Sequence, residues 1–282
     1  MIMPCRPPSF CTLTFCLAVT FMFSSCTHSG STDGGSPVNN SYLASARNIS
    51  SEGILVDSFS YDDKKRVATF GQYGYPADGS DSGKMTAAFN FSGNNTLPDS
   101  YVYTLNDDPS VLHALTFDGQ GRITKDTSTG ADHFVAYYTY SGNYIISRIF
   151  ADGDLSSEAY ADTMIVTDGN MTGEKLWTWD PSETQWTDQE QVTYGRAAAA
   201  NPGYKAEIAA AVGPLLHALS LYNFSGYGDY VSKNIVNKLT GMLEGLPPGG
   251  ASYTTHVDAT GRVTELLPSI PGADGKVVFT YY

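Results

Sequence analysis

A turn pattern that recurs three times places the tightest constraint on what this chain can fold into. Each copy has an apolar or aromatic residue, an Asp, a short turn, and then a basic residue followed by an aliphatic one; the copies span residues 61–67, 117–124 and 257–264. Asp opens such a turn by accepting backbone amides, and Gly takes the positive φ angle. The pattern therefore predicts three β-hairpins. In the first copy Lys65 replaces the glycine, so we expect that turn to be built differently.

The segments between these turns alternate in the manner of half-buried strands. Aromatic and β-branched residues recur with period two, bounded by Gly, Asn and Asp, in residues 136–140, 144–150 and 276–282. The 28 Gly, 19 Tyr and 13 Phe residues favour many short strands joined by tight turns. Another hairpin is expected within residues 175–194. The sequence thus predicts an all-β fold, an antiparallel meander of hairpins that curls into a barrel-like or partly open body.

One segment departs from the strand pattern. Residues 204–222 are rich in Ala and Leu and predict a short helical insertion. Pro214 lies within this stretch and would end one segment or begin the next, because proline interrupts a helix interior.

The amino terminus has the layout of a bacterial lipoprotein signal peptide. Arg6 precedes an apolar run that ends at Ser24 and Ser25, directly before Cys26. The run is shorter than the roughly 20 apolar residues that a transmembrane helix needs. The segment from Phe23 to Cys26 resembles a lipobox, although an aliphatic residue is usual at the position of Phe23. We expect three parts: a signal peptide at 1–25, a flexible tether at 26–48 rich in Ser, Gly and Asn, and a single β domain at 49–282.

Cysteine usage and charge exclude several classes of function. All four cysteines lie within the first 26 residues, so after cleavage Cys26 would be the sole thiol and would carry the lipid. A structural disulfide, a thiol nucleophile and a cysteine-ligated zinc ion are then impossible in the body. The net charge of −13, with no basic patch, argues against nucleic acid as a partner. Thr27, in place of Asp, resembles lipoproteins that are sorted to the outer membrane.

The repeats also carry a resemblance to a family. The copies at 117–124 and 257–264 resemble the Tyr-Asp turns of Bacteroidetes-type lipoproteins, a family of unknown function with a porin-like β fold. Further matches fall at residues 168–171, 201–202 and 232–234, so the resemblance covers roughly residues 55–282. It implies a barrel-like or partly open antiparallel sheet attached by an amino-terminal lipid, and it brings no activity and no catalytic residues. Because the alternating runs are shorter than the about 9–11 residues of a spanning strand, we do not expect a membrane-spanning barrel.

No catalytic, cofactor or metal set emerges from the sequence. Asp132 and His133 are neighbours on a predicted strand and would point to opposite faces. The acids around residues 152–154 read as turn carboxylates, and the remaining histidines read as isolated structural residues. We therefore name no catalytic residue, cofactor or metal ligand.

Three tryptophans form the one candidate ligand platform. Trp177 and Trp179 would share one face of a strand, and Trp186 returns across the predicted hairpin. Such a cluster can stack on sugar rings or lipid. The alternative is that the hairpin buries its largest residues in the core, and exposure of the cluster would decide between the two.

The resulting hypothesis is an exported, lipid-anchored outer-membrane protein that binds a ligand or partner without catalysis. The membrane is a partner through the lipid anchor, and glycan, lipid or an envelope protein are the further partners considered; a barrel interior could enclose a lipid. One alternative is a glycoside hydrolase-like enzyme with dispersed carboxylates, which would need two acids about 5–9.5 Å apart. The other is a structural subunit of an outer-membrane complex.

Overall fold

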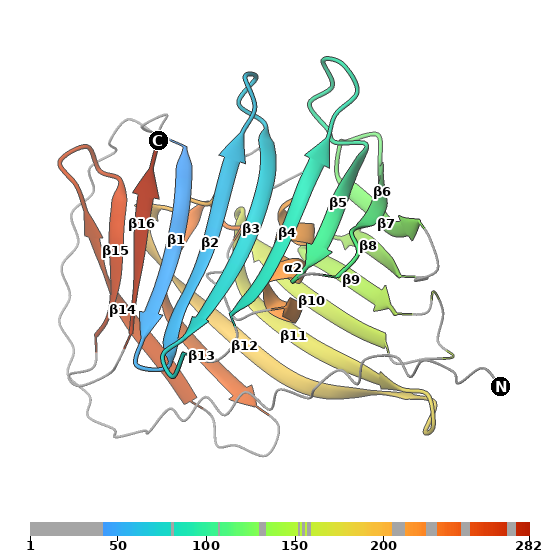
Figure 1. The fold of residues 1–282 in the computed structure, drawn as a ribbon. Helices are drawn as coiled ribbons and strands as arrows, with labels where there is room; N and C mark the ends of the chain where they lie inside the picture. The colour runs from blue at the N-terminus through green and yellow to red at the C-terminus, as the bar shows by residue number, and fades with distance from the viewer. Residues whose placement is uncertain are drawn as a thin grey trace. The chain divides into compact units, whose positions relative to one another are not determined.

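The protein is described here by a computed structural model, in which sixteen antiparallel strands of the described residues form one closed barrel (Figure 1). The structure describes residues 42–79, 82–106, 108–129, 134–151, 153, 156, 159–204, 212–223, 230–243, 249–269 and 275–282. Each strand pairs with its neighbours in sequence, and β1 pairs with β16 to close the ring. The expected all-β meander is confirmed, and of its two forms the chain adopts the closed one. The expected signal peptide and Cys26 lie outside the described residues.

In the part of the chain that the structure describes, the strands follow one another in sequence order, and helix α2 lies between β12 and β13. Their bounds are β1 Leu43–Ser50, β2 Gly53–Tyr61, β3 Val67–Pro76, β4 Gly83–Asn90, β5 Ser100–Leu105, β6 Val111–Phe117, β7 Ile123–Thr129, β8 Val135–Ser141, β9 Tyr144–Phe150, β10 Ala159–Thr167, β11 Asn170–Asp180, β12 Gln185–Ala200, α2 Gly213–Asn223, β13 Asn234–Leu243, β14 Gly249–Val257, β15 Val263–Pro268 and β16 Lys276–Tyr281.

The first strand begins earlier than the sequence predicts. We expected the tether to reach residue 48, but β1 already starts at Leu43. Leu43 and Ala46 are buried, and β1 pairs along its length with β2 and β16. The Ser- and Asn-rich composition concealed this strand, because its two buried apolar residues do not alternate with period two.

The three repeated turns are the predicted hairpins, joining β2 to β3, β6 to β7 and β14 to β15. In the second copy Asp118 Oδ1 accepts the backbone amides of Gln120 and Arg122, while Asp118 Oδ2 accepts the Arg122 guanidinium. The Arg122 guanidinium also lies 4.2 Å from the ring centroid of Tyr140 on the adjacent strand β8. One Asp thus satisfies the turn's amides and orients the Arg that stacks on the next strand.

The expectation that the first turn is built differently is wrong. Asp62 accepts the amides of Lys64 and Arg66 in the same way, and Lys65 takes the positive φ of 64° that Gly121 takes at 75° in the second copy. The Asp contacts therefore hold a lysine in a backbone region that normally costs an L-residue about 1–2 kcal/mol.

Replacing Lys65 with glycine is expected to raise the free energy of unfolding by about 0.5 kcal/mol, because relief of the φ strain outweighs the greater chain entropy of glycine. Urea titration followed by circular dichroism measures the change. The matched control is Gly121→Ala, where a Cβ would lie 3.7 Å from Leu97 without a clash, so the cost is conformational alone. That variant should lose about 1 kcal/mol. If both substitutions raised the free energy of unfolding, or both lowered it, this account would be contradicted.

The barrel interior is filled with side chains and by α2. In β4, the buried residues Met85, Ala87 and Phe89 alternate with outward residues, as a half-buried strand requires. Leu215 and Leu216 of α2 belong to the same core cluster as these residues. Figure 1 shows the helix enclosed by the ring of strands. Because α2 and these core side chains occupy the interior, they argue against a lipid held there.

Helix α2 begins next to Pro214, which is one of the two roles expected for that residue. Pro214 occupies its first turn, where the missing amide of proline has no intrahelical partner to lose. Residues 205–211, the first part of the predicted insertion, lie outside the described residues. Among the described residues, none of the helices has the length and apolar character needed to cross a bilayer.

The outer face of the barrel is mixed in character. Aromatic residues such as Tyr75 and Tyr137 are exposed there, but so are charged side chains on many strands. Register and alternation place these charged residues outward: Lys84, Lys125, Arg148, Lys175 and Lys238. A spanning barrel carries a continuous apolar band on this face, and charges there are costly. The expectation that the barrel does not span a membrane stays a prediction, because β3, β11 and β12 have 10, 11 and 16 residues and so reach the strand length that a spanning barrel needs.

Candidate functional site: an aromatic hairpin and buried polar clusters

The three tryptophans lie on the predicted hairpin, which consists of β11 and β12. Trp179 and Trp186 are directly opposite in the register, and their ring centroids lie 5.5 Å apart at an interplanar angle of 55°. Trp177 lies two residues before Trp179 on the same outer face and is opposite residue 188. All three are half-buried, so they are not core residues of the barrel interior. The structure pairs two of the tryptophans and places the third beside them.

This hairpin reaches past its neighbour on one side. Within the described residues β13 ends at Leu243, opposite Glu190, whereas β12 begins at Gln185. Figure 1 shows the β11–β12 tip projecting beyond the other strands. Asp180 organises the turn by accepting the amide and hydroxyl of Ser182. The Trp179–Trp186 pair thus lies at the base of a projecting tip.

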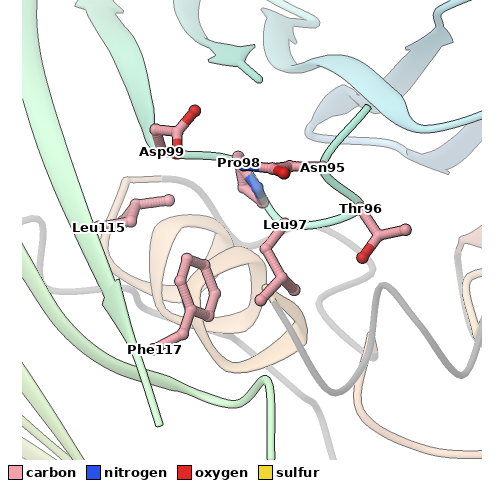
Figure 2. Close-up of a pocket in the computed structure, with 7 residues that line it drawn as sticks. All are labelled: Asn95, Thr96, Leu97, Pro98, Asp99, Leu115 and Phe117. Atoms are coloured by element: carbon pink, nitrogen blue, oxygen red, sulfur yellow. The ribbon is translucent and has the colours of Figure 1, made fainter. Parts of the chain in front are cut away.

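A pocket of about 340 Å³ lies at the rim of the barrel (Figure 2). Leu97, Leu115 and Phe117 give it an apolar wall. Two of its polar groups are engaged: Asp99 accepts the amide of Ser92, and the backbone carbonyl of Asn95 accepts the Arg66 guanidinium. The pocket offers apolar contact without a catalytic set.

Two buried carboxylates in the interior have partners on both oxygens. Asp126 on β7 lies 2.9 Å from His113 Nδ1 and accepts the Tyr101 hydroxyl at 2.6 Å. Asp57 on β2 accepts the Gln72 amide at 2.7 Å and the hydroxyl of Tyr230. Burial raises the pKa of Tyr101 well above its ordinary value, and the Asp126 charge adds to the effect. In each cluster both carboxylate oxygens are satisfied and separate elements of the core are linked, although Gln72 Oε1 is buried without a hydrogen-bond partner.

A third cluster joins the helix to the barrel wall. His217 of α2 lies with Nε2 at 2.9 Å from Glu174 Oε1 on β11 and 3.7 Å from Asp162 Oδ2 on β10. Tyr194 on β12 donates its hydroxyl to Glu174 Oε2. Asp162 is 0% exposed, and Glu174 and His217 are each 2% exposed. The arrangement gathers one imidazole and two carboxylates in a site closed to solvent.

The two acids of this third cluster differ in their proton affinity. Burial raises the pKa of Asp162 well above its ordinary value, and the neighbouring Glu174 charge raises it further. Burial would also raise the pKa of Glu174, but the His217 charge and the hydrogen bonds from His217 and Tyr194 hold that pKa below its usual range. Glu174 is therefore the ionised member of the pair.

Asp162 differs from the other buried acids in its hydrogen bonding. Of the four buried carboxylates in the described part of the chain, Asp57, Asp126 and Glu174 have partners on both oxygens. Neither oxygen of Asp162 has a hydrogen-bond partner within 3.5 Å, and only the Glu174 carboxyl group interacts with it as a hydrogen-bonding group from farther away. Ser147, opposite Asp162 on β9, is also buried with an unpartnered hydroxyl. Buried polar groups are normally satisfied, so this pair of residues needs an explanation.

The sequence predicts that His113 and His217 are isolated structural residues, but each meets a buried acid from another element. No local motif could reveal these meetings, because the partners lie 13 and 43 residues apart. The available signal was a charged residue at an inward strand position, as at Asp162 and Glu174. Asp132, His133, Asp152 and Asp154 lie outside the described residues, as does Cys26.

Comparison with known proteins shows likeness in fold. No family model matches the sequence, and no curated protein matches it. Among solved structures, a porin-like protein from Bacteroides vulgatus ATCC 8482 aligns with a TM-score of 0.52 and 11% identity, over 86% of this chain and 99% of that one. A porin-like protein from Bacteroides uniformis ATCC 8492 aligns with a TM-score of 0.50 and 13% identity, over 85% and 96%. At these identities the likeness establishes a porin-like barrel fold alone.

Proposed function

We propose that this chain is a non-enzymatic cell-envelope protein, anchored by a lipid on Cys26, that binds glycan at the Trp179–Trp186 pair. The observation that carries the binding proposal is the position of this pair, two half-exposed indoles on the outer face of a projecting hairpin. Indole faces provide large apolar contact surfaces of fixed shape, which stack on the apolar faces of sugar rings. A single hairpin presents both rings from a rigid wall.

The interior argues for binding at the surface. Helix α2 and the core side chains occupy the barrel interior, so a ligand would meet the protein at its outer face or rim. The acidic net charge of −13 favours a neutral or cationic ligand over an anionic one. Neutral glycan satisfies both conditions.

The glycosidase alternative receives little support from the geometry. Asp162 and Glu174 are a close acid pair, but both are buried, and a sugar cannot reach them without opening the barrel. Retaining and inverting glycosidases place their two carboxyl groups on either side of a substrate cleft. The acids found here therefore favour a role inside the fold.

The binding proposal is tested by affinity gel electrophoresis through soluble β-glucan, xylan and α-mannan. At least one of these neutral polysaccharides should retard the wild type, and replacing Trp179 and Trp186 together with alanine should weaken the interaction at least about tenfold, as expected for buried aromatic anchors. The control is Tyr144→Ala, which removes an aromatic residue that is 47% exposed on β9. A wild type that none of the three retards, or a double variant with unchanged retardation, would rule out this glycan site.

A further inference from the structure

We infer that Asp162, Glu174 and His217 form a binding site for a divalent transition-metal ion of the zinc class, which fixes α2 to the barrel wall. One ligand atom from each of these three buried residues lies within 4.8 Å of the others. The residues come from β10, β11 and α2, so an ion bound by all three would connect the helix to two strands. This inference is independent of the proposed glycan site.

The donor set matches the chemistry of such an ion. One imidazole nitrogen and two carboxylate oxygens suit zinc and its first-row neighbours, and three protein ligands leave a fourth position for water. A tetrahedral site with bonds of about 2.1 Å separates its donor atoms by about 3.4 Å. The distances from His217 Nε2, 2.9 Å to Glu174 and 3.7 Å to Asp162, fall on either side of that value.

The charge of the cluster also calls for a cation. Two carboxyl groups and one imidazole are gathered in a site closed to water, and a divalent ion bound by both acids would neutralise the negative charge that they carry when ionised. A single proton shared between the acids would supply a partner to one Asp162 oxygen. The other Asp162 oxygen and the Ser147 hydroxyl would remain without a partner. A metal ion with a bound water accounts for these remaining groups together.

The surrounding residues support the ligands in the way that metal sites require. Tyr194 donates a hydrogen bond to the Glu174 oxygen that faces away from His217. Hydrogen bonds of this kind orient a carboxylate ligand and are characteristic of the second layer around bound metals. By contrast, the His113–Asp126 cluster has both carboxylate oxygens saturated and contributes one acid only. It serves as an internal control for a His–acid pair without a metal.

The test uses the full chain, refolded after treatment with EDTA and then dialysed against zinc chloride. Elemental mass spectrometry should find one zinc ion per chain. Calorimetry should show a Tm about 5–10 °C higher with zinc at a hundredfold excess over its Kd than with EDTA, because the ion binds the folded state. A wild type that retains no zinc and shows no shift would overturn the inference.

Substitutions then assign the ligands. Asp162→Asn and His217→Gln should each abolish both the stoichiometric zinc and the Tm shift. In the control, Asp126→Asn should lower the Tm and leave the zinc response intact. If the Asp162→Asn variant still binds one zinc ion and shows the full Tm shift, Asp162 is not a metal ligand and the proposed site is wrong. A proton shared between the two acids would then be the better explanation of the cluster. Should a variant fail to fold, cobalt titration of the wild type decides the matter: visible d–d absorption of a tetrahedral ion is expected, and its absence would contradict the site.

Discussion

Replacing Leu216 with alanine is expected to lower the free energy of unfolding by about 3–4 kcal/mol. Leu216 lies on α2, is 0% exposed and belongs to the main core cluster inside the barrel. Truncation removes the transfer energy of the side chain and leaves a cavity that a closed ring of strands cannot collapse to fill. Urea denaturation followed by circular dichroism measures the loss.

The same substitution on the outer face provides a matched control. Leu112 on β6 is 43% exposed, so Leu112→Ala should change the free energy of unfolding by no more than about 0.5 kcal/mol. Similar losses at Leu112 and Leu216 would mean that α2 is not part of the packed interior.

Replacing Cys26 with serine is expected to shift the protein from the membrane fraction to the soluble fraction. The proposed anchor is attached to the Cys26 sulfur, and a serine hydroxyl cannot take its place. Acyl chains supply the membrane affinity, since each buried methylene contributes about 0.8 kcal/mol. Cell fractionation with immunoblotting measures the distribution.

The control for this change is Cys16→Ser, which alters a cysteine of the expected signal peptide without touching the lipid-bearing residue. That variant should fractionate with the membrane like the wild type. A Cys26→Ser protein that stays fully membrane-bound would disprove lipid anchoring at this residue.

Much of the barrel could be predicted from local sequence signals. Alternation in β8, β9 and β16 and the Asp turns between paired strands are properties of short segments, and the structure follows them. The closure of the ring could not be predicted in this way. It depends on β1 pairing with β16, as in the hydrogen bond between Ser45 and Thr280, 235 residues apart. Local pattern carries no information about such a contact.

The error at Lys65 has a related cause. A residue type indicates the preferred φ angle, but the Asp62 contacts and the pairing of β2 with β3 outweigh that preference. The early start of β1 is similar, since tertiary pairing makes a strand of a segment whose composition favours a tether. In both cases tertiary contacts override an intrinsic preference.

The site was predictable in part. The aromatic hairpin follows from spacing, since Trp177 and Trp179 share a face and the Asp180 turn brings Trp186 back beside them. The Asp162–Glu174–His217 cluster could not be predicted from the sequence, because it forms only when α2 packs inside the barrel. Inward charged residues in otherwise apolar strands were the visible sign, but their partners depend on packing.

The pairing of the first strand with the last has a consequence for the order of events during synthesis. β1 keeps one unpaired edge until residues 276–281 of β16 have been made, and contacts of such long sequence separation form late in folding. An incomplete sheet exposes amide and carbonyl groups that invite pairing with other chains. The ring therefore closes only after β16 has been made, and until then β1 and the growing end of the sheet both present open edges.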